Sequence, residues 1–435
     1  MTSMPIAGNE RATLPSERLN RGCFCVTLDR DALAAAFDRE VGIPGFTEAL
    51  QHSHPVLFSN SPVFVPAEAL AEMTQVVAAV EAAAVLPGYR ETVLSWASPL
   101  AQRDFGPAGA LMGYDFHVGA DGPKLIEVNT NAGGAFLNAM LARAQRACCG
   151  QAAAPSPGVE DFAAHVTEMF LDEWRLQKGS GRPRRIAILD DAPQTQHLLS
   201  EFELARAMLR SQGVECVIGD PRDLTRDRDE VSLAGLPVDL VYNRLVDFAL
   251  DEDAHTSLRD AYRDGLVVVT PNPHVYALFA DKRNLTLLCD SQRLRAWGLK
   301  PEHLRVLGVA ALATVLVTAS NADALWSERR NWFFKPARGH ASKAAYRGDK
   351  LTRRVWGEIT TADYVAQAYA EPGVRNVQHG GARSELKVDV RLYTYSGRVL
   401  LTAARIYRGQ TTNMRTPGGG FAPVLAIPSA ADAAA

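Results

Sequence analysis

Oxygen-bearing side chains gather in one short stretch near residue 120. Asp115 is followed, after a turn predicted at 120–122, by Glu127 and Asn129. Side chains alternate along a strand, so Glu127 and Asn129 project from one face, and a hairpin brings Asp115 alongside them. Two carboxylates and an amide oxygen suit Mg²⁺, which prefers oxygen ligands and keeps waters and phosphates in its other positions. The stretch therefore predicts a magnesium site.

Two other interpretations of these carboxylates stay open. They could form an acid/base pair without a metal, or they could stand on an exposed hairpin that has no function. The strand is otherwise apolar at Leu125, Ile126 and Val128. An acidic residue inside such a strand is costly to bury without a cation, so we favour the metal site.

Cations and glycines gather in the last third of the chain. Lys335 lies in an aromatic run at 332–336 and is followed by a loop at 338–343 that is rich in small and basic residues. Such a loop can lay backbone N–H groups and a fixed lysine on phosphates. Further on, Lys387, Asp389 and Arg391 alternate with apolar residues, which indicates that they share one face of a strand.

Hydrophobic periodicity predicts the elements that position these residues. Residues 111–117 and 124–129 predict two strands joined by the turn, and residues 66–86 predict a helix that begins with a proline. The apolar positions of this helix repeat at helical spacing and predict a face that packs on the core: Leu70, Met73, Val77 and Val80.

Residues 185–271 alternate between strand and helix patterns. A helix is predicted over 200–212, with Ser200 and Glu203 at capping-box spacing and Gly213 where a helix end tolerates positive φ. Four buried strands are predicted around it, at 186–189, 214–218, 238–242 and 266–269. This order predicts a small parallel sheet with helices on its faces.

Composition narrows the classes of protein. The 435 residues include 46 Lys and Arg and 49 Asp and Glu, for a net charge of −3, so no basic excess indicates nucleic-acid binding. The longest apolar stretch, 306–318, is shorter than the ~20 residues that cross a bilayer. The polar start at 1–20 lacks the apolar core of a signal peptide, which favours a cytoplasmic location and small-molecule substrates.

Common catalytic and metal-binding motifs are missing from the sequence. The six cysteines include no CxxC pair, so we interpret them as buried or incidental thiols. There is no GxxxxGK[ST], HExxH or GxSxG motif. Arg244 follows a predicted strand at the ligand edge of the small sheet and could bind a substrate carboxylate, but we expect a surface arginine. The role of His117 stays open: it could support the metal site, or it could be a structural histidine.

Several motifs carry a family resemblance. Lys335 with its loop, residues 365–369, Asp389-x-Arg391, and Arg405 followed by Asn413 and three glycines at 418–420 occur in the order seen in bacterial glutathione synthetase and ribosomal-protein glutamate ligases. Those are ATP-grasp enzymes. Asn272-Pro273 and 281–283 resemble the family's entry into its nucleotide domain. The resemblance covers about 185–425 and 60–135 and implies an α/β ATP-grasp fold.

The order of the segments resembles a circularly permuted family member. An ordinary ATP-grasp ligase places a helix and the metal-binding hairpin after the triple glycine, whereas here both lie before the small α/β domain. Glutathionylspermidine synthetases and eukaryotic glutathione synthetases are similarly permuted. The implied organisation is a tail at 1–20, the permuted part of the ATP-grasp domain with the metal hairpin at 21–150, a linker and helix at 151–180, a pre-ATP-grasp α/β domain at 181–275, the nucleotide-binding part at 276–427 and a tail at 428–435.

The resemblance also implies roles for single residues. Lys282, Lys335, Ser342 and Lys387 would belong to the ATP site, with Gln367, Ala368 and Tyr369 as the hinge beside adenine. Asp115, Glu127 and Asn129 would hold Mg²⁺, while Arg391, Arg405 and Asn413 would act on the acyl phosphate and the transferred group. The chain departs from the family in two places. Alanines follow Ser342-Lys343 where glycine is frequent, and the hinge begins with Gln367 instead of an acidic residue.

The implied activity is an ADP-forming carboxylate–amine ligase that works through an acyl phosphate. Two alternatives remain: an ATP-grasp phosphotransferase that leaves phosphate on its product, and an ATP-binding module without turnover. Substrate loops in this class vary, so the acid and amine stay open among amino acids, peptides and polyamines. No oligomeric state is predicted.

Overall fold

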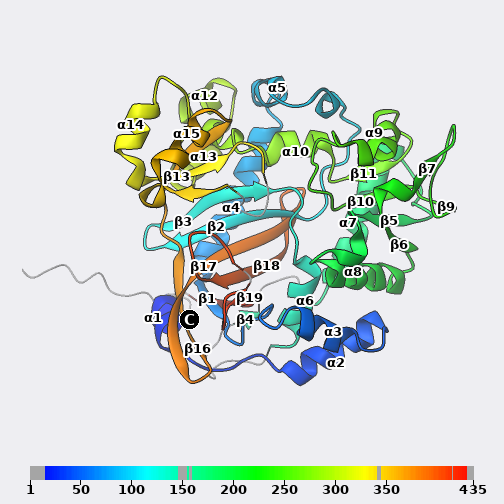
Figure 1. Ribbon diagram of the computed structural model, residues 1–435, viewed down its shortest axis with the longest axis horizontal. Helices are drawn as coiled ribbons and strands as arrows, with labels where there is room; N and C mark the ends of the chain where they lie inside the picture. The colour runs from blue at the N-terminus through cyan, green and yellow to red at the C-terminus, as the bar shows by residue number, and fades with distance from the viewer. Residues whose placement is uncertain (1–14, 146–153, 156–158, 340–343, 414, 429–435) are drawn as a thin grey trace, which may run out of the picture.

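Four sheets organise the computed structural model (Figure 1), which describes residues 15–145, 154–155, 159–339, 344–413 and 415–428. The largest sheet has eight strands, with the path β1-β19-β18-β17-β2-β3 and with β16 and β4 paired to β17 and β19. Its strands come from both ends of the chain: β1 (Val63–Pro66), β2 (Met112–Gly119), β3 (Gly122–Asn129), β4 (Ala154–Pro155), β16 (Gly373–His379), β17 (Ala382–Tyr395), β18 (Arg398–Tyr407) and β19 (Gly420–Ile427).

The predicted helix and hairpin pack on each other. Helix α4 (Ala67–Ala84) contacts β2 and β3, and α5 (Pro87–Ser95) follows it. Met73, Val77 and Val80 of the predicted stripe are at most 1% exposed, whereas Leu70 is half-buried against the same core. The stripe prediction is therefore confirmed for its central residues, and the hairpin turn is formed with Gly122 at φ 79°.

The small parallel sheet has the order β11-β10-β5-β6. Its strands are β5 (Ile186–Leu189), β6 (Cys216–Gly219), β10 (Leu240–Asn243) and β11 (Val268–Thr270), and α7 (Phe162–Lys178), α8 (Leu199–Ser211) and α9 (Thr256–Arg263) accompany it. The predicted parallel sheet is confirmed. The predicted capping box is wrong, because Ser200 lies inside α8, whose N-cap residue is Leu198 and makes no side-chain cap hydrogen bond. A short antiparallel sheet of β7 (Leu224–Arg226), β8 (Val231–Leu233) and β9 (Leu236–Pro237) extends from this region.

A four-stranded antiparallel sheet, β12-β15-β13-β14, lies beyond the β2–β3 edge of the largest sheet (Figure 1). It is formed by β12 (Thr314–Leu316), β13 (Trp332–Pro336), β14 (Tyr346–Arg347) and β15 (Tyr364–Ala368), with α14 (Ala322–Ser327) and α15 (Arg353–Thr360). Its small core contains Phe334, Trp356 and Ile359. Helices α10 (Pro273–Phe279), α11 (Asn284–Leu288), α12 (Ser291–Ala296) and α13 (Pro301–Ala310) lead into it.

The N-terminal region contains helices that the sequence analysis did not predict. These are α1 (Pro15–Gly22), α2 (Arg30–Val41) and α3 (Phe46–Ser53), and α6 (Ala135–Arg143) packs against α2. The tail expected at 1–20 therefore differs at its last residues, which belong to α1 and are hydrogen-bonded to β1. The Asn20 amide donates to the Phe64 carbonyl at 2.8 Å and accepts from the Phe64 N–H at 3.0 Å.

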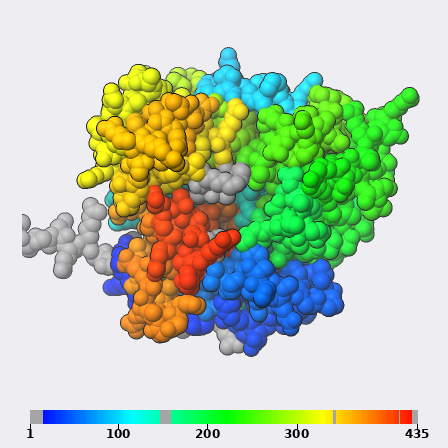
Figure 2. Space-filling model, in the orientation of Figure 1, coloured from blue at the N-terminus to red at the C-terminus, as the bar shows by residue number. Residues whose placement is uncertain are grey.

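No single helix in the described part of the chain is long and apolar enough to cross a membrane. Only taken together do helices α4 and α5 have the length and apolar composition of a membrane span, and the two helices are bent by 78° relative to each other. Figure 2 shows that the regions of the four-stranded sheet (yellow to orange), the parallel sheet (green) and the N-terminal helices (blue) surround the middle of one face.

A buried histidine at the edge of the parallel sheet allows a test of this region. His255 is fully buried, with Nδ1 at 2.7 Å from Asp247 and Nε2 at 3.1 Å from Asp191. Burial lowers the pKa of His255, but the two carboxylates outweigh it, so the net pKa is raised. Protonated His255 therefore stabilises the folded protein. This stabilisation is complete below the pKa of ~6.5 in the unfolded chain and is lost as pH rises through the higher pKa of the folded protein.

We expect His255→Asn to reduce the free energy of unfolding by about 1–3 kcal/mol at pH 6, with a smaller loss at pH 9. Urea denaturation at both pH values measures it. His52→Asn, on the exposed end of α3, is the matched control and should have little effect at either pH. An equal loss for His255→Asn at pH 6 and pH 9 would contradict the charged-histidine assignment.

Candidate nucleotide and metal site

The two distant ends of the chain meet in the middle of the largest sheet. Strand β17 runs antiparallel to β2, with Arg391 opposite Asp115, and β2 places Asp115 opposite Glu127 on β3. The predicted meeting of the acidic hairpin with the cationic last third is therefore confirmed. Strand β18 completes the arrangement by placing Arg405 opposite Asp389.

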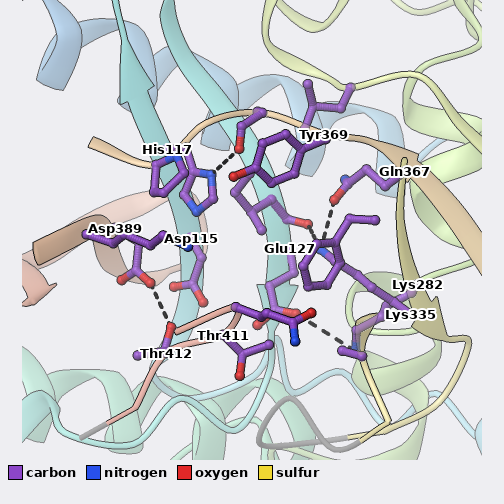
Figure 3. Close-up of a pocket in the computed structure, with 18 of the residues that line it drawn as sticks. Asp115, His117, Glu127, Lys282, Lys335, Gln367, Tyr369, Asp389, Thr411 and Thr412 are labelled. Carbon is purple, nitrogen blue, oxygen red and sulfur yellow. Dashed lines mark hydrogen bonds and ion pairs between the residues drawn. The ribbon is translucent and has the colours of Figure 1, made fainter. Parts of the chain in front are cut away.

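A cavity lies where this meeting point faces the four-stranded sheet (Figure 3). The acidic hairpin, the lysines and the hinge strand all contribute to its wall. Most residues assigned from the sequence line it: Asp115, Glu127, Asn129, Lys282, Lys335, Gln367, Ala368, Tyr369, Lys387 and Arg405. One cavity thus joins groups that are separated by up to 290 positions in the sequence.

Asp115 is the centre of a buried ion-pair network. Arg391 donates to its two oxygens at 2.5 and 2.6 Å, and Arg405 donates at 2.9 Å. Arg405 also donates to Asp389 at 2.6 Å. Burial raises the pKa of Asp115, but the two guanidinium groups outweigh it and hold the pKa well below its usual range. Asp115 is therefore ionised, and its charge is neutralised by protein groups.

Glu127 and Asn129 lie beside this network and make fewer hydrogen bonds and ion pairs than Asp115. The Asn129 amide donates to Asp115 at 3.2 Å and to Glu127 at 3.1 Å, so the three head groups converge. The cation nearest Glu127 is Lys282, whose Nζ lies 4.0 Å from Oε2. Burial raises the pKa of Glu127, but Lys282 and Lys335 lower it more, and the carboxylate stays charged.

Lys335 is buried without a carboxylate in contact. Its Nζ donates to the Ile126 carbonyl and to the Gln367 Oε1, both at 2.8 Å. Burial lowers the pKa of Lys335 to about 8, with Glu127 opposing the shift. A lysine whose partners are neutral acceptors keeps its positive charge available for an anion in the cavity.

The hinge residues and a histidine form the opposite end of the cavity. His117 donates a hydrogen bond of 2.8 Å from its Nδ1 to the Ala370 carbonyl. This bond joins β2 to the segment after β15. The Tyr369 ring lies beneath the guanidinium of Arg347, at 4.3 Å. Sequence reasoning left His117 open and did not identify Thr411 and Thr412, which also line the cavity. A half-buried threonine pair in a loop carries no recognisable pattern.

Two of the residues assigned from the sequence do not line the cavity. Arg391 lies behind Asp115 and does not contribute to the cavity wall. Asn413 is exposed, and its Oδ1 accepts from the Arg415 N–H at 2.9 Å, so it too is outside the wall. Ser342 lies outside the described residues. Lys387 lines the cavity and donates to the Gly409 carbonyl at 2.5 Å.

Arg244 contradicts the expectation of a surface arginine. It is only 5% exposed, and its Nη1 donates to the Tyr242 hydroxyl at 3.1 Å. Its Nε has no hydrogen-bond partner among the residues that the structure describes. Burial raises the pKa of nearby Glu201 to about 7, and Arg244 opposes that shift. The Gly133 segment lies against this arginine, since a Cβ on Gly133 would be 3.4 Å from its Nη2.

The converging oxygen ligands fit a hard divalent cation in part. Among the described residues, no group of three His, Cys, Asp or Glu is placed to hold a metal ion by itself. Glu127 and Asn129 offer a carboxylate and an amide, and most lone pairs of Asp115 already accept from arginines. Such a set fits Mg²⁺ that takes its remaining ligands from phosphate and water.

Comparisons with known proteins identify the fold. No protein-family model matches the sequence, and no curated protein sequence matches it. The apo structure of a glutathione synthetase-like effector, GSS30, from Globodera pallida aligns over 92% of this chain and 98% of its own, with a TM-score of 0.55 and 14% identity.

Two further structures align less closely. A putative gamma-glutamylcysteine synthetase from Methylobacillus flagellatus KT covers 81% of this chain and 87% of its own, with a TM-score of 0.46 and 12% identity. The ATP-grasp ligase PsnB complexed with a minimal precursor covers 57% of this chain and 77% of its own, with a TM-score of 0.33 and 13% identity. The fold of this chain is thus similar to that of the glutathione synthetase-like effector GSS30, and the resemblance seen in the sequence is confirmed at the level of the fold.

The Asp115 network predicts a large loss of stability on neutralisation. Asp115→Asn leaves the buried guanidinium of Arg391 without its carboxylate and Arg405 with Asp389 alone, and breaking a buried pair from one side costs about 3–5 kcal/mol. We expect a loss of this size in the free energy of unfolding measured with guanidinium chloride. The exposed Asp251→Asn serves as control. A loss below about 1 kcal/mol for Asp115→Asn would show that the network does not stabilise the sheet.

Proposed function

We propose that this protein is an ATP-dependent carboxylate–amine ligase that works through an acyl phosphate. The observation that carries the proposal is one cavity wall that combines Lys282, Lys335 and Arg405 with the carboxylate of Glu127. Several cations and a carboxylate around one cavity suit phosphoryl transfer. That reaction depends on positioning of the reacting groups and on neutralisation of phosphate charge. The glutathione synthetase-like fold supports the same activity.

The cavity offers separate places for the parts of the nucleotide. Lys282 and Lys335 would bind phosphate oxygens, and the backbone at 368–370 would contact the base. Glu127 and Asn129 would hold Mg²⁺ beside Asp115, with the Asn129 amide turned so that its oxygen faces the ion. The ion would neutralise phosphate charge when bound.

Arg405 lies where the transferred group would pass. A substrate carboxylate oxygen attacks the terminal phosphorus of ATP, the bond to the ADP oxygen breaks, and an acyl phosphate forms. The amine then attacks the acyl carbon, phosphate leaves with the bonding electron pair, and the amine loses a proton to give the amide. Arg405 is fixed by Asp115 and Asp389 and would stabilise the charge on the phosphoryl group in both steps.

Arg244 is a candidate for binding the acid substrate. Its guanidinium lies next to Gly133, whose carbonyl accepts from Arg391 at 3.4 Å, so it is close to the network around Asp115. The unpartnered Nε can donate to a carboxylate in a geometry that suits a planar fork. We propose that Arg244 holds a carboxylate of the acid substrate while the reacting carboxylate faces Arg405.

The function is tested by incubating the protein with ATP, Mg²⁺ and pools of amino acids, short peptides and polyamines, while ADP is measured and products are identified by mass spectrometry. A condensed product with free phosphate is expected. A phosphorylated product would instead identify a phosphotransferase, and ATP binding without any product would identify a binding module. Either outcome contradicts the ligase.

Glu127→Gln tests the metal assignment. Glutamine keeps the shape but removes the charge that would attract Mg²⁺, so we expect kcat to fall more than about 100-fold with little change in the melting temperature. Glu302→Gln on the exposed face of α13 is the matched control. Retention of full activity by Glu127→Gln would exclude the metal assignment.

Arg244→Gln tests the acid-binding assignment. Loss of a charge-assisted hydrogen bond predicts a rise in KM for the acid of about 10–100-fold, with a smaller effect on kcat and on KM for ATP. Arg244→Lys keeps the charge but not the fork and should give an intermediate KM. The exposed Arg295→Gln should leave all three constants unchanged. An equal rise in both KM values would indicate a general structural role instead.

A further inference from the structure

The side chain of Gln367 has an orientation that its partner imposes. It is 2% exposed and contributes to the cavity wall from the end of β15. Its Oε1 accepts from Lys335 Nζ at 2.8 Å (Figure 3). An ammonium group can only donate, so the amide oxygen must face Lys335 and the NH₂ group must point elsewhere. The orientation of this amide is therefore determined by chemistry.

The NH₂ group of Gln367 lacks an acceptor. Its Nε2 is buried and has no hydrogen-bond partner within the described part of the chain. Nearly all buried polar groups in folded proteins are paired, and an unpaired amide donor costs about 1–3 kcal/mol. A donor that is held in place by a buried lysine, and that borders a cavity, is suited to an acceptor supplied by a ligand.

The position of Gln367 indicates which ligand atom it meets. It is the first residue of the hinge at 367–369 and contacts Lys335, so it stands between the proposed base and phosphate ends of the cavity. The phosphate oxygens have the two lysines as stronger partners. The base remains, and a purine with its N1 and N6 edge against the hinge backbone presents N7, an acceptor, on the adjoining edge.

We propose that Gln367 donates a hydrogen bond from Nε2 to N7 of a purine base and so selects purine nucleotides. The inference rests on the proposed nucleotide site and adds a side-chain contact to it. Lys335 positions the amide, which makes the lysine important for base selection as well as for phosphate binding. A pyrimidine has no ring nitrogen at the equivalent place and would leave the donor unpaired.

The test removes each partner of the hydrogen bond in turn. Dissociation constants for ATP and for 7-deaza-ATP, in which a carbon replaces N7, are measured by equilibrium titration on the full chain. We expect the wild type to bind 7-deaza-ATP about 5–30-fold more weakly than ATP. In Gln367→Met, which lacks the donor, the two constants should agree within about 2-fold.

Two further variants serve as controls. Gln367→Glu keeps an acceptor for Lys335 but has no donor, so its two constants should also agree. Gln378→Met, at an exposed position of β16, should keep the wild-type difference. CTP should bind the wild type more weakly than ATP.

The possible outcomes separate this inference from the proposed function. Equal binding of ATP and 7-deaza-ATP by the wild type would overturn the Gln367 contact, even if both Gln367 variants failed to fold. A difference that persists in both variants would overturn it as well. Absence of any ATP binding by the folded wild type would overturn the nucleotide site itself, and with it the ligase.

Discussion

The carboxylate of Asp115 is the group on which the architecture of the cavity depends. Two guanidinium groups from β17 and β18 converge on it; Asp115 and Arg391 are buried, and Arg405 is partly exposed where it lines the cavity. Charges removed from water repay their desolvation only in a favourable geometry with other hydrogen bonds satisfied. That geometry exists only when the hairpin from the first third of the chain is paired with strands from the last third. Sheet pairing and charge pairing therefore require each other.

The same constraint divides the cations of the cavity into two kinds. Arg391 and Arg405 are neutralised by Asp115 and Asp389, so they are fixed in place before any ligand arrives. Lys335 has neutral partners, and Lys282 lies no closer than 4.0 Å to Glu127. Rigid arginines and underpaired lysines suit a site where phosphates enter beside the lysines and charge develops beside an arginine.

Local patterns predicted much of this arrangement, and tertiary contacts explain what they missed. The parallel strands and the hairpin have strong periodicity, so both are present within two or three residues of the predicted bounds. Ser200 had the spacing of a cap but lies within a helix, because helix ends depend on packing as well as on local sequence. Arg391 and Asp389 share one face of β17, as predicted. The position of Arg391 beside Asp115 and outside the cavity wall depends on the pairing of β17 with β2, which the sequence of β17 does not indicate. Arg244 is buried beside the distant Gly133 segment, a contact that no pattern around residue 244 indicates.

The glycine pair after the β2–β3 hairpin shows why segments around the cavity can approach so closely. Gly134 has a φ of 96°, and a Cβ there would lie 2.4 Å from the Phe421 ring. A Cβ on Gly133 would lie 2.8 Å from Leu198 of the parallel-sheet region. Tyr393 meanwhile donates to the Gly133 carbonyl at 2.8 Å. A side chain at Gly134 would therefore clash with the largest sheet in a backbone conformation that favours glycine, and one at Gly133 would press on Leu198 and on Arg244, so the small size of both residues permits the close approach of Arg244 to the network around Asp115.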